Sequence, residues 1–174
     1  MLNIAQIGRH AVAVGFAIVV NGLTPRPASA QTQTIAYVFA APGAVTCCGY
    51  SERTLHVGGG GEVLAGGRVG VGAELGFLGP AAEMAEGFGV MSVNGSYHFG
   101  PVQRTSTLEP FVTGGYTMFF RGGQAHLWNV GGGVDYWFHR RSGLRIELRD
   151  HLYGGEGETA HFWGARIGVV VRGK

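Results

Sequence analysis

The feature that most constrains this chain is a simple alternation. Over its last three-quarters, stretches occur in which every second residue is apolar and the residues between are Gly, Ser, Asn, His or charged. The stretch RVGVGAELGF (68–77) is the clearest example. A period of two places the two sets on opposite faces of a β-strand. The polar face is small and mixed in charge sign, unlike the solvated face of a soluble sandwich, so we predict a sheet whose apolar face meets lipid.

Composition limits the alternatives. A length of 174 residues suits one domain. Glycine accounts for 33 of these residues, well above the usual share of about 7%, but without the strict repeat of collagen. Hydrophobic residues make up 45% of the chain, which argues against disorder. Glycines inside alternating strands fit a tightly curved barrel. The formal net charge of +2 and the absence of a basic stripe give no reason to expect nucleic acid as a partner.

The N-terminal segment has the pattern of a signal peptide. Arg9 and His10 precede an apolar run at 11–20, and the small residues at 28–30 follow two prolines. The apolar run is half the length of about 20 residues that a spanning helix needs. We therefore predict cleavage after Ala30, with a signal peptide at 1–30 and one barrel domain at 31–174.

Eight strands are expected in the rest of the chain, and most are long enough to cross a bilayer when tilted. Their predicted ranges are 34–40, 54–64, 68–78, 89–99, 108–120, 125–138, 144–153 and 160–171. An even number of antiparallel strands can close without a free edge, which lipid could not satisfy. The predicted fold is an all-β, eight-stranded, antiparallel up-and-down transmembrane β-barrel.

The expected connections differ in length. The segments 41–52, 79–87 and 154–159 are long, whereas 65–67 and 139–143 are short. Short turns of such barrels face the periplasm and longer loops face outwards. Two connections depart from this rule, because 121–124 is a short outer loop and 100–106 a longer inner turn.

The predicted outward face is apolar, with aromatic residues toward the strand ends, as in the girdles of membrane barrels. Its members are Leu55, Val57, Val63, Val69, Val71, Leu75, Phe77, Met91, Val93, Tyr97, Phe99, Val112, Tyr116, Met118, Phe120, Trp128, Val130, Val134, Tyr136, Phe138, Leu144, Ile146, Leu148, Leu152, Trp163, Ile167, Val169 and Val171.

The predicted inward face is polar and nearly balanced in charge. Its ionic members are Glu62, Arg68, Glu74, Glu109, Asp135, Arg145, Glu147, Arg149 and Arg166, and Asn94, His98 and His151 accompany them. Charges inside a closed barrel must be paired or hydrated, because an unpaired buried charge costs several kcal/mol. An eight-stranded barrel is just wide enough for side chains to fill it. We therefore expect a paired network that plugs the interior.

Few residues suggest chemistry. The adjacent Cys47 and Cys48 are expected to be two loop thiols, because neighbouring cysteines form only a strained ring, and a redox or metal-binding pair is the alternative. His151 and His161 flank a loop with Glu156 and Glu158, where a metal site is conceivable.

Two other patterns also point away from catalysis. Ser96 and His98 share a face, but that face is inward, so we expect hydrogen-bonding groups there rather than a hydrolase. The run of four glycines at 58–61 lacks the helix and the Lys that a phosphate loop needs. No catalytic residue, metal site or cofactor is predicted.

Three stretches resemble strands of the small eight-stranded outer-membrane barrels of Gram-negative bacteria, the group that includes the membrane domain of outer membrane protein A. They are LEPFVTGGY (108–116), NVGGGVDYW (129–137) and GLRIELRD (143–150). The resemblance implies location in the outer membrane and assembly by the barrel assembly machinery. That family usually ends its last strand in an aromatic residue, whereas this chain ends VVVRGK (169–174), with Phe162 and Trp163 at the start of the same strand.

The function that follows is that of a non-enzymatic integral outer-membrane protein, a monomer with a structural or surface-interaction role. Its expected partners are outer-membrane lipid and the assembly machinery. The alternatives are a narrow channel or transporter, a barrel-embedded lipid-modifying hydrolase, and a secreted calycin-like ligand binder with an apolar interior.

Overall fold

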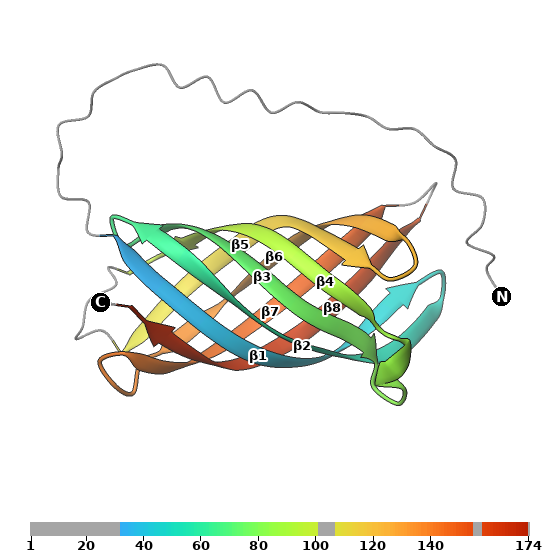
Figure 1. Cartoon of the computed structure of the whole chain (residues 1–174), viewed down its shortest axis with the longest axis horizontal. Coiled ribbons are helices and arrows are strands. Elements are labelled where there is room, and N and C mark those ends of the chain that lie inside the picture. The colour runs from blue at the N-terminus through green and yellow to red at the C-terminus, as the bar shows by residue number, and fades with distance from the viewer. Residues whose placement is uncertain (1–31, 101–106, 155–157, 174) are drawn as a thin grey trace, which may run out of the picture.

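The chain forms one closed barrel of eight antiparallel strands (Figure 1). The computed structural model describes residues 32–100, 107–154 and 158–173. The strands are β1 (Gln33–Cys47), β2 (Tyr50–Ala65), β3 (Val69–Pro80), β4 (Phe88–His98), β5 (Leu108–Phe120), β6 (Gln124–Tyr136), β7 (Ser142–Gly154) and β8 (Thr159–Arg172), with a 3₁₀ turn at Met84–Glu86. The predicted fold class is confirmed. The predicted signal peptide and its cleavage after Ala30 lie outside the described residues.

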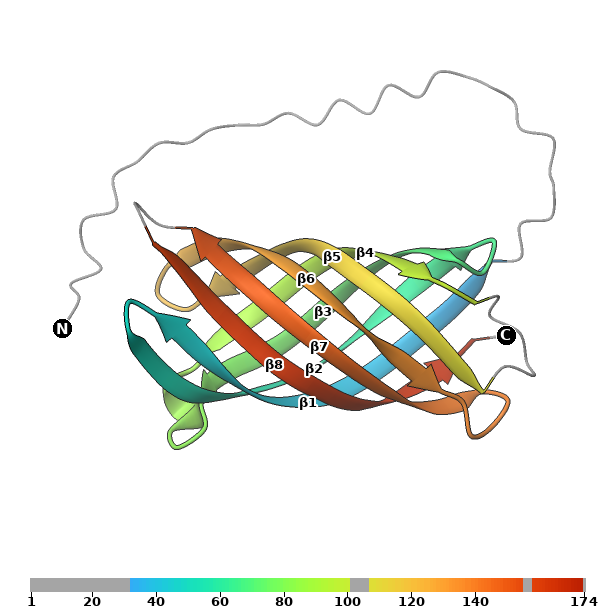
Figure 2. The same ribbon diagram turned by 180° about the vertical axis from the view of Figure 1, so that it is seen from behind.

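The barrel is closed by the first and last strands. β1 pairs with β2 and also with β8, with registers that run from Gln33↔Leu64 and from Ile35↔Arg172. Strands β2 to β7 each pair with their two neighbours in the chain, and β8 pairs with β7 and β1, so the described strands close the wall without a free edge strand. The strands are strongly tilted, as both side views show (Figures 1 and 2). No helix among the described residues is long and apolar enough to cross a membrane.

Several strands extend further than predicted. The segment 41–52, expected to be a long loop, continues the ladder between β1 and β2 up to the pair Cys47↔Tyr50. Only Cys48 and Gly49, both with positive φ, make the turn. The alternating pattern of apolar residues does not reach this far along the two strands. Backbone pairing continues there without it.

The two rims of the barrel carry different connections. The rim at which β1 begins and β8 ends also holds the β2–β3 and β6–β7 turns, and we call it the termini rim (Figures 1 and 2). The opposite rim holds the β1–β2, β3–β4 and β5–β6 connections. The side chains of the wall alternate between the lumen and the outside, so the interior and the outer surface carry different sets of side chains.

Candidate functional site

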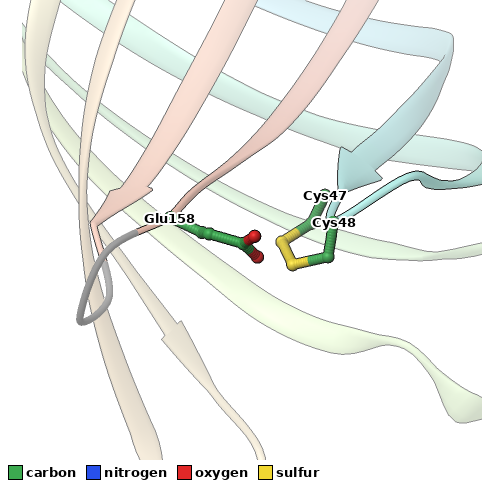
Figure 3. Close-up of side chains that lie close together, drawn as sticks. All are labelled: Cys47, Cys48 and Glu158. Carbon is green, nitrogen blue, oxygen red and sulfur yellow. A yellow bond between two sulfur atoms is a disulfide. The ribbon is translucent and has the colours of Figure 1, made fainter.

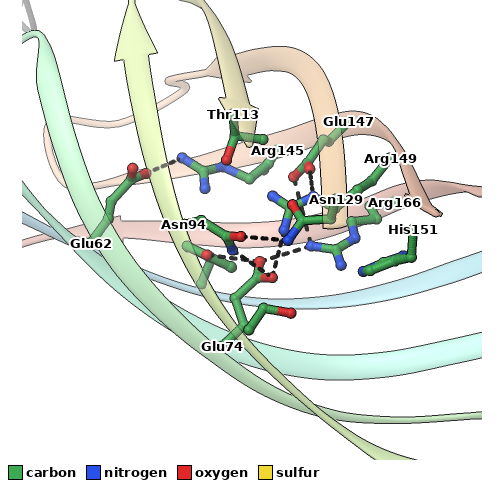
Figure 4. A network of polar contacts seen from close by, with 12 residues as sticks. Glu62, Glu74, Asn94, Thr113, Asn129, Arg145, Glu147, Arg149, His151 and Arg166 are labelled. Atoms are coloured by element: carbon green, nitrogen blue, oxygen red, sulfur yellow. Dashed lines mark hydrogen bonds and ion pairs between the residues drawn. The ribbon is translucent and has the colours of Figure 1, made fainter. Parts of the chain in front are cut away.

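Glu74 on β3 is the centre of a polar network inside the barrel (Figure 4). Its carboxylate accepts hydrogen bonds from Tyr37 Oη at 2.9 Å and Asn94 Nδ2 at 3.1 Å. It also pairs with Arg149 Nη1 at 2.6 Å and Arg166 Nη1 at 2.8 Å. These partners come from β1, β4, β7 and β8, so one carboxylate connects strands from around the barrel wall.

A second cluster surrounds Arg145 on β7. Its guanidinium donates to Glu62 Oε1 at 2.8 Å and to both carboxylate oxygens of Asp135, at 2.7 and 2.8 Å. The same group lies between the rings of Tyr37 and Phe111, 4.4 and 4.5 Å from their centroids. The charge of Arg145 is therefore shared between two carboxylates and two aromatic faces.

Three further ion pairs lie in the described interior. Glu147 pairs with Arg149 and lies 3.9 Å from Arg166 Nη1. Toward the termini rim, Glu109 accepts from Arg172 Nη2 at 2.6 Å and from Trp137 Nε1 at 3.0 Å. Each of the five predicted interior carboxylates is buried and has an arginine partner. They are Glu62, Glu74, Glu109, Asp135 and Glu147.

One predicted member of this network is misplaced. Arg68 was expected to point inward, but β3 begins at Val69, and Arg68 lies exposed in the turn before it. The alternating sequence pattern begins at Arg68, one residue before β3. Outside the strand, the backbone no longer determines whether a side chain points inward or outward. Among the described residues the fourth interior arginine is Arg172 instead, which was not predicted because it lies at the end of the last strand. Its inward position follows from its even spacing from Arg166.

The interior also holds apolar side chains that sequence reasoning did not assign to it. One buried cluster contains Leu78, Val90, Phe119 and Leu127, toward the opposite rim. Another contains Ile35, Tyr37, Phe39, Trp137 and Val170 along β1 and near the termini rim. A cavity of about 10 Å³, lined by residues such as Tyr37, Glu62 and Arg149, lies within the polar network. This is room for about one water molecule.

The serine and histidine on β4 are structural groups. Ser96 Oγ donates to Glu62 Oε2 at 2.6 Å, and His98 Nε2 lies 3.5 Å from the same oxygen. Asn94 bonds to Glu74. The expectation that these side chains are interior hydrogen-bonding groups is confirmed. The hydroxyl of Ser96 is directed at a carboxylate rather than at the imidazole, so the pair lacks the arrangement of an activated nucleophile.

The conceivable metal site around His151 and His161 is not formed. His151 is buried, with Nδ1 3.3 Å from the carbonyl oxygen of Phe162, and its ring packs against Phe119. His161 Nδ1 instead lies 2.7 Å from Asp150 Oδ2, and both residues are partly exposed. The two imidazoles are separated because alternation sends His151 into the lumen and His161 to the outside. Glu156 lies outside the described residues.

Cys47 and Cys48 form a disulfide at the β1–β2 turn (Figure 3). The prediction of two separate loop thiols is therefore wrong. The reason lies in the turn, because Cys48 adopts a left-handed conformation with φ 56° that brings adjacent side chains together. The carboxylate of Glu158 points toward the pair, and the three ligand atoms lie within 4.8 Å of one another. Bonded to each other, the sulfurs offer no thiolate to a metal.

The outer surface is an apolar belt. Every residue of the predicted outward face is exposed or half-buried, with Val71 at 65%, Leu148 at 65% and Trp128 at 70% exposure. Aromatic residues border this belt at both rims: Tyr97, Phe99, Tyr136 and Phe138 at the termini rim, and Phe77, Phe120, Trp128 and Trp163 toward the other. The orientation is the reverse of a soluble barrel, which overturns the calycin-like alternative and its apolar interior.

Comparison with known proteins agrees with this architecture. No protein-family model and no curated protein sequence matches the chain. Among solved structures, the N-terminal β-barrel domain of Pseudomonas aeruginosa OprF is similar at 19% identity and a TM-score of 0.58, covering 81% of this chain and 97% of that one. Neisserial surface protein A is similar at 14% identity and a TM-score of 0.61, covering 79% and 96%. The chain therefore has the fold of the small outer-membrane β-barrels, with transmembrane strands, as the resemblance implied.

Proposed function

We propose that the protein is a monomeric, non-enzymatic integral protein of the outer membrane, with a structural or surface-contact role and an interior closed to solutes. The apolar belt supports insertion into lipid, since a contiguous exposed apolar surface of this extent is a liability in water. Outer-membrane lipid and the barrel assembly machinery are the partners that this placement implies.

The observation that carries the closed interior is the set of ion pairs that cross the lumen. β3 is paired only with β2 and β4, yet Glu74 reaches Arg149 on β7 and Arg166 on β8. These bonds therefore span the lumen rather than follow the wall (Figure 4). Breaking a buried pair leaves an uncompensated charge at a cost of several kcal/mol, so a path for ions is energetically expensive to open.

A non-catalytic role is supported by the placement of the polar residues. The hydroxyl of Ser96 and the imidazole of His98 are both held on Glu62 inside the barrel. A lipid substrate would approach from the outer face, where the described side chains of the belt are mostly apolar. The polar exceptions His126, Asp150 and His161 lie toward the rim opposite the termini.

Conductance across planar bilayers tests this proposal. The purified protein should migrate anomalously on a denaturing gel until it is boiled, which establishes a folded barrel, and should add no stepwise conductance. The charge-neutral variant Glu74→Ala/Arg166→Ala, which removes one crossing pair, should conduct.

Stepwise conductance by the unmodified protein would overturn the closed interior in favour of a channel. Release of fatty acid from lipid by the purified protein would overturn the non-enzymatic role.

A further inference from the structure

Exposed charges are distributed unequally between the two rims. The termini rim carries Arg68 in the β2–β3 turn and His139, Arg140 and Arg141 in the β6–β7 turn, all exposed. The opposite rim is mixed, with Glu83, Glu86 and Glu158 exposed beside Arg53 and Arg121. Among the described residues, one rim of the barrel is therefore cationic, and the other carries both signs.

Among the described residues of the termini rim, no side-chain carboxylate is available to neutralise these arginines. The acidic residues nearest to it among those described, Glu109 and Asp135, are fully buried and paired with Arg172 and Arg145. Within the described part of the chain, no ion pair involves Arg68, Arg140 or Arg141. Their guanidinium groups are thus open to an external anion.

The arginines lie where the apolar belt ends. Arg68 directly precedes Val69, which is 55% exposed, and Arg140 follows Phe138, which is 62% exposed, by two residues. Aromatic and basic residues in this order are typical of the boundary between hydrocarbon and headgroups. A guanidinium at this depth meets the phosphate layer, and its planar fork matches phosphate in a bidentate manner.

The two arginine-bearing turns lie on opposite sides of the barrel. In the closed strand order, β4 and β5 separate them on one side and β8 and β1 on the other, and the two turns lie apart in Figure 1. One small ligand could not contact both. Lipid surrounds the barrel and reaches every part of its circumference. These are also the two short turns expected to face the periplasm, where the leaflet consists of phospholipid.

We propose that Arg68, Arg140 and Arg141 form a cationic collar that binds the headgroups of acidic phospholipids, such as phosphatidylglycerol, in the surrounding leaflet. This inference rests on the proposed membrane insertion. A basic residue near an anionic membrane surface contributes about 1 kcal/mol, which corresponds to about a fivefold change in relative association constant for each arginine.

Spin-labelled lipids provide the test. The folded protein is reconstituted in phosphatidylcholine vesicles with a trace of spin-labelled phosphatidylglycerol or phosphatidylcholine, and electron paramagnetic resonance measures the protein-bound fraction of each label. Both leaflets have the same composition, so the direction of insertion does not affect the result. The unmodified protein should select phosphatidylglycerol, and added salt should weaken that selection because it screens exposed charges.

Variants separate the collar from a general effect of charge. Arg68→Ala should lower the selectivity by about fivefold or less, and Arg140→Ala/Arg141→Ala should lower it further. Arg53→Ala removes one exposed arginine from the opposite rim and serves as the matched control for Arg68→Ala. The heat-dependent gel shift shows whether each variant is inserted and folded, so failure of insertion is distinguishable from failure of the collar.

Two results of the lipid-binding measurement would overturn the proposal. One is a folded protein that binds both labels equally. The other is a selectivity that Arg53→Ala lowers as much as Arg68→Ala. A separate assay measures whether the protein sediments with purified peptidoglycan. If the collar variants keep their lipid selectivity but no longer sediment with peptidoglycan, the arginines bind that periplasmic polymer and the lipid assignment is wrong.

Discussion

A single residue, Arg145, shows how charge is accommodated inside this barrel. Its side chain is 5% exposed and is bound by Glu62 and Asp135. Burial of an isolated guanidinium would be prohibitive, but two carboxylates and two aromatic faces replace its hydration. Arg68, the residue that the same alternation assigned to the interior, is exposed and unpaired among the described residues.

Replacement of these two arginines should have unequal effects on stability. Arg145→Met leaves Glu62 and Asp135 without their shared cation, so we expect a loss of about 3–5 kcal/mol in the free energy of unfolding. Arg68→Met, the matched control, should change it by less than about 0.5 kcal/mol. Urea unfolding in vesicles of phosphatidylcholine alone, which offer the exposed Arg68 no anionic headgroup, measures both values. Equal losses for the two variants would contradict the interior that we describe.

At the scale of elements, the spacing between strands depends on where glycine occurs. Gly115 on β5 faces β4, and a Cβ there would lie 2.1 Å from the carbonyl oxygen of Val93. Its neighbour Gly114 has more room, since a Cβ there would come no closer than 3.4 Å, to the carbonyl oxygen of Asn129. The inward glycine thus permits a close approach of two strands, which agrees with the expectation that glycines relieve crowding in a curved wall.

The adjacent glycines allow a matched comparison. Gly115→Ala forces a methyl group against backbone and should destabilise the barrel by about 1–3 kcal/mol. Gly114→Ala should remain within about 0.5 kcal/mol of the unmodified protein. The fraction that folds into vesicles, measured by the gel shift across a urea series, reports both. A tolerated Gly115→Ala would mean that β4 and β5 are not held this closely.

At the scale of the whole molecule, the depth of a residue in the belt determines what a charge costs. Leu75, 62% exposed, lies mid-way along β3, and Val69, 55% exposed, lies at its start beside the termini rim. Both side chains face outwards on the same strand. In water the two positions would be nearly equivalent, whereas in a bilayer one is near the midplane and the other near the headgroups.

Arginine substitutions at these two positions test the membrane placement directly. Leu75→Arg should cost about 2–4 kcal/mol and Val69→Arg about 0–1 kcal/mol, because the penalty falls from the midplane to the interface. Reversible unfolding from vesicles gives both numbers. If the two substitutions cost the same, or if the protein is monomeric and soluble without detergent, the belt does not face lipid.

The sequence by itself determined which side of the wall most residues face. Alternation follows from backbone geometry, so the outward positions from Leu55 to Val171 and the inward carboxylates could be assigned before any contact was known. The number and order of strands followed in the same way, because each crossing needs its own alternating stretch. The fold could be predicted to this extent because the pattern is local.

The tertiary structure alone decided which charges meet and where the pattern stops. Glu74 and Arg166 are 92 residues apart, and only closure of β1 on β8 brings them together across the lumen. The features that differ from the prediction all lie at strand ends. They are the interior position of Arg172 in place of Arg68, the disulfide between Cys47 and Cys48, and the long β1–β2 hairpin. There lipid no longer imposes alternation, and turn geometry and pairing across the barrel determine the position of each side chain.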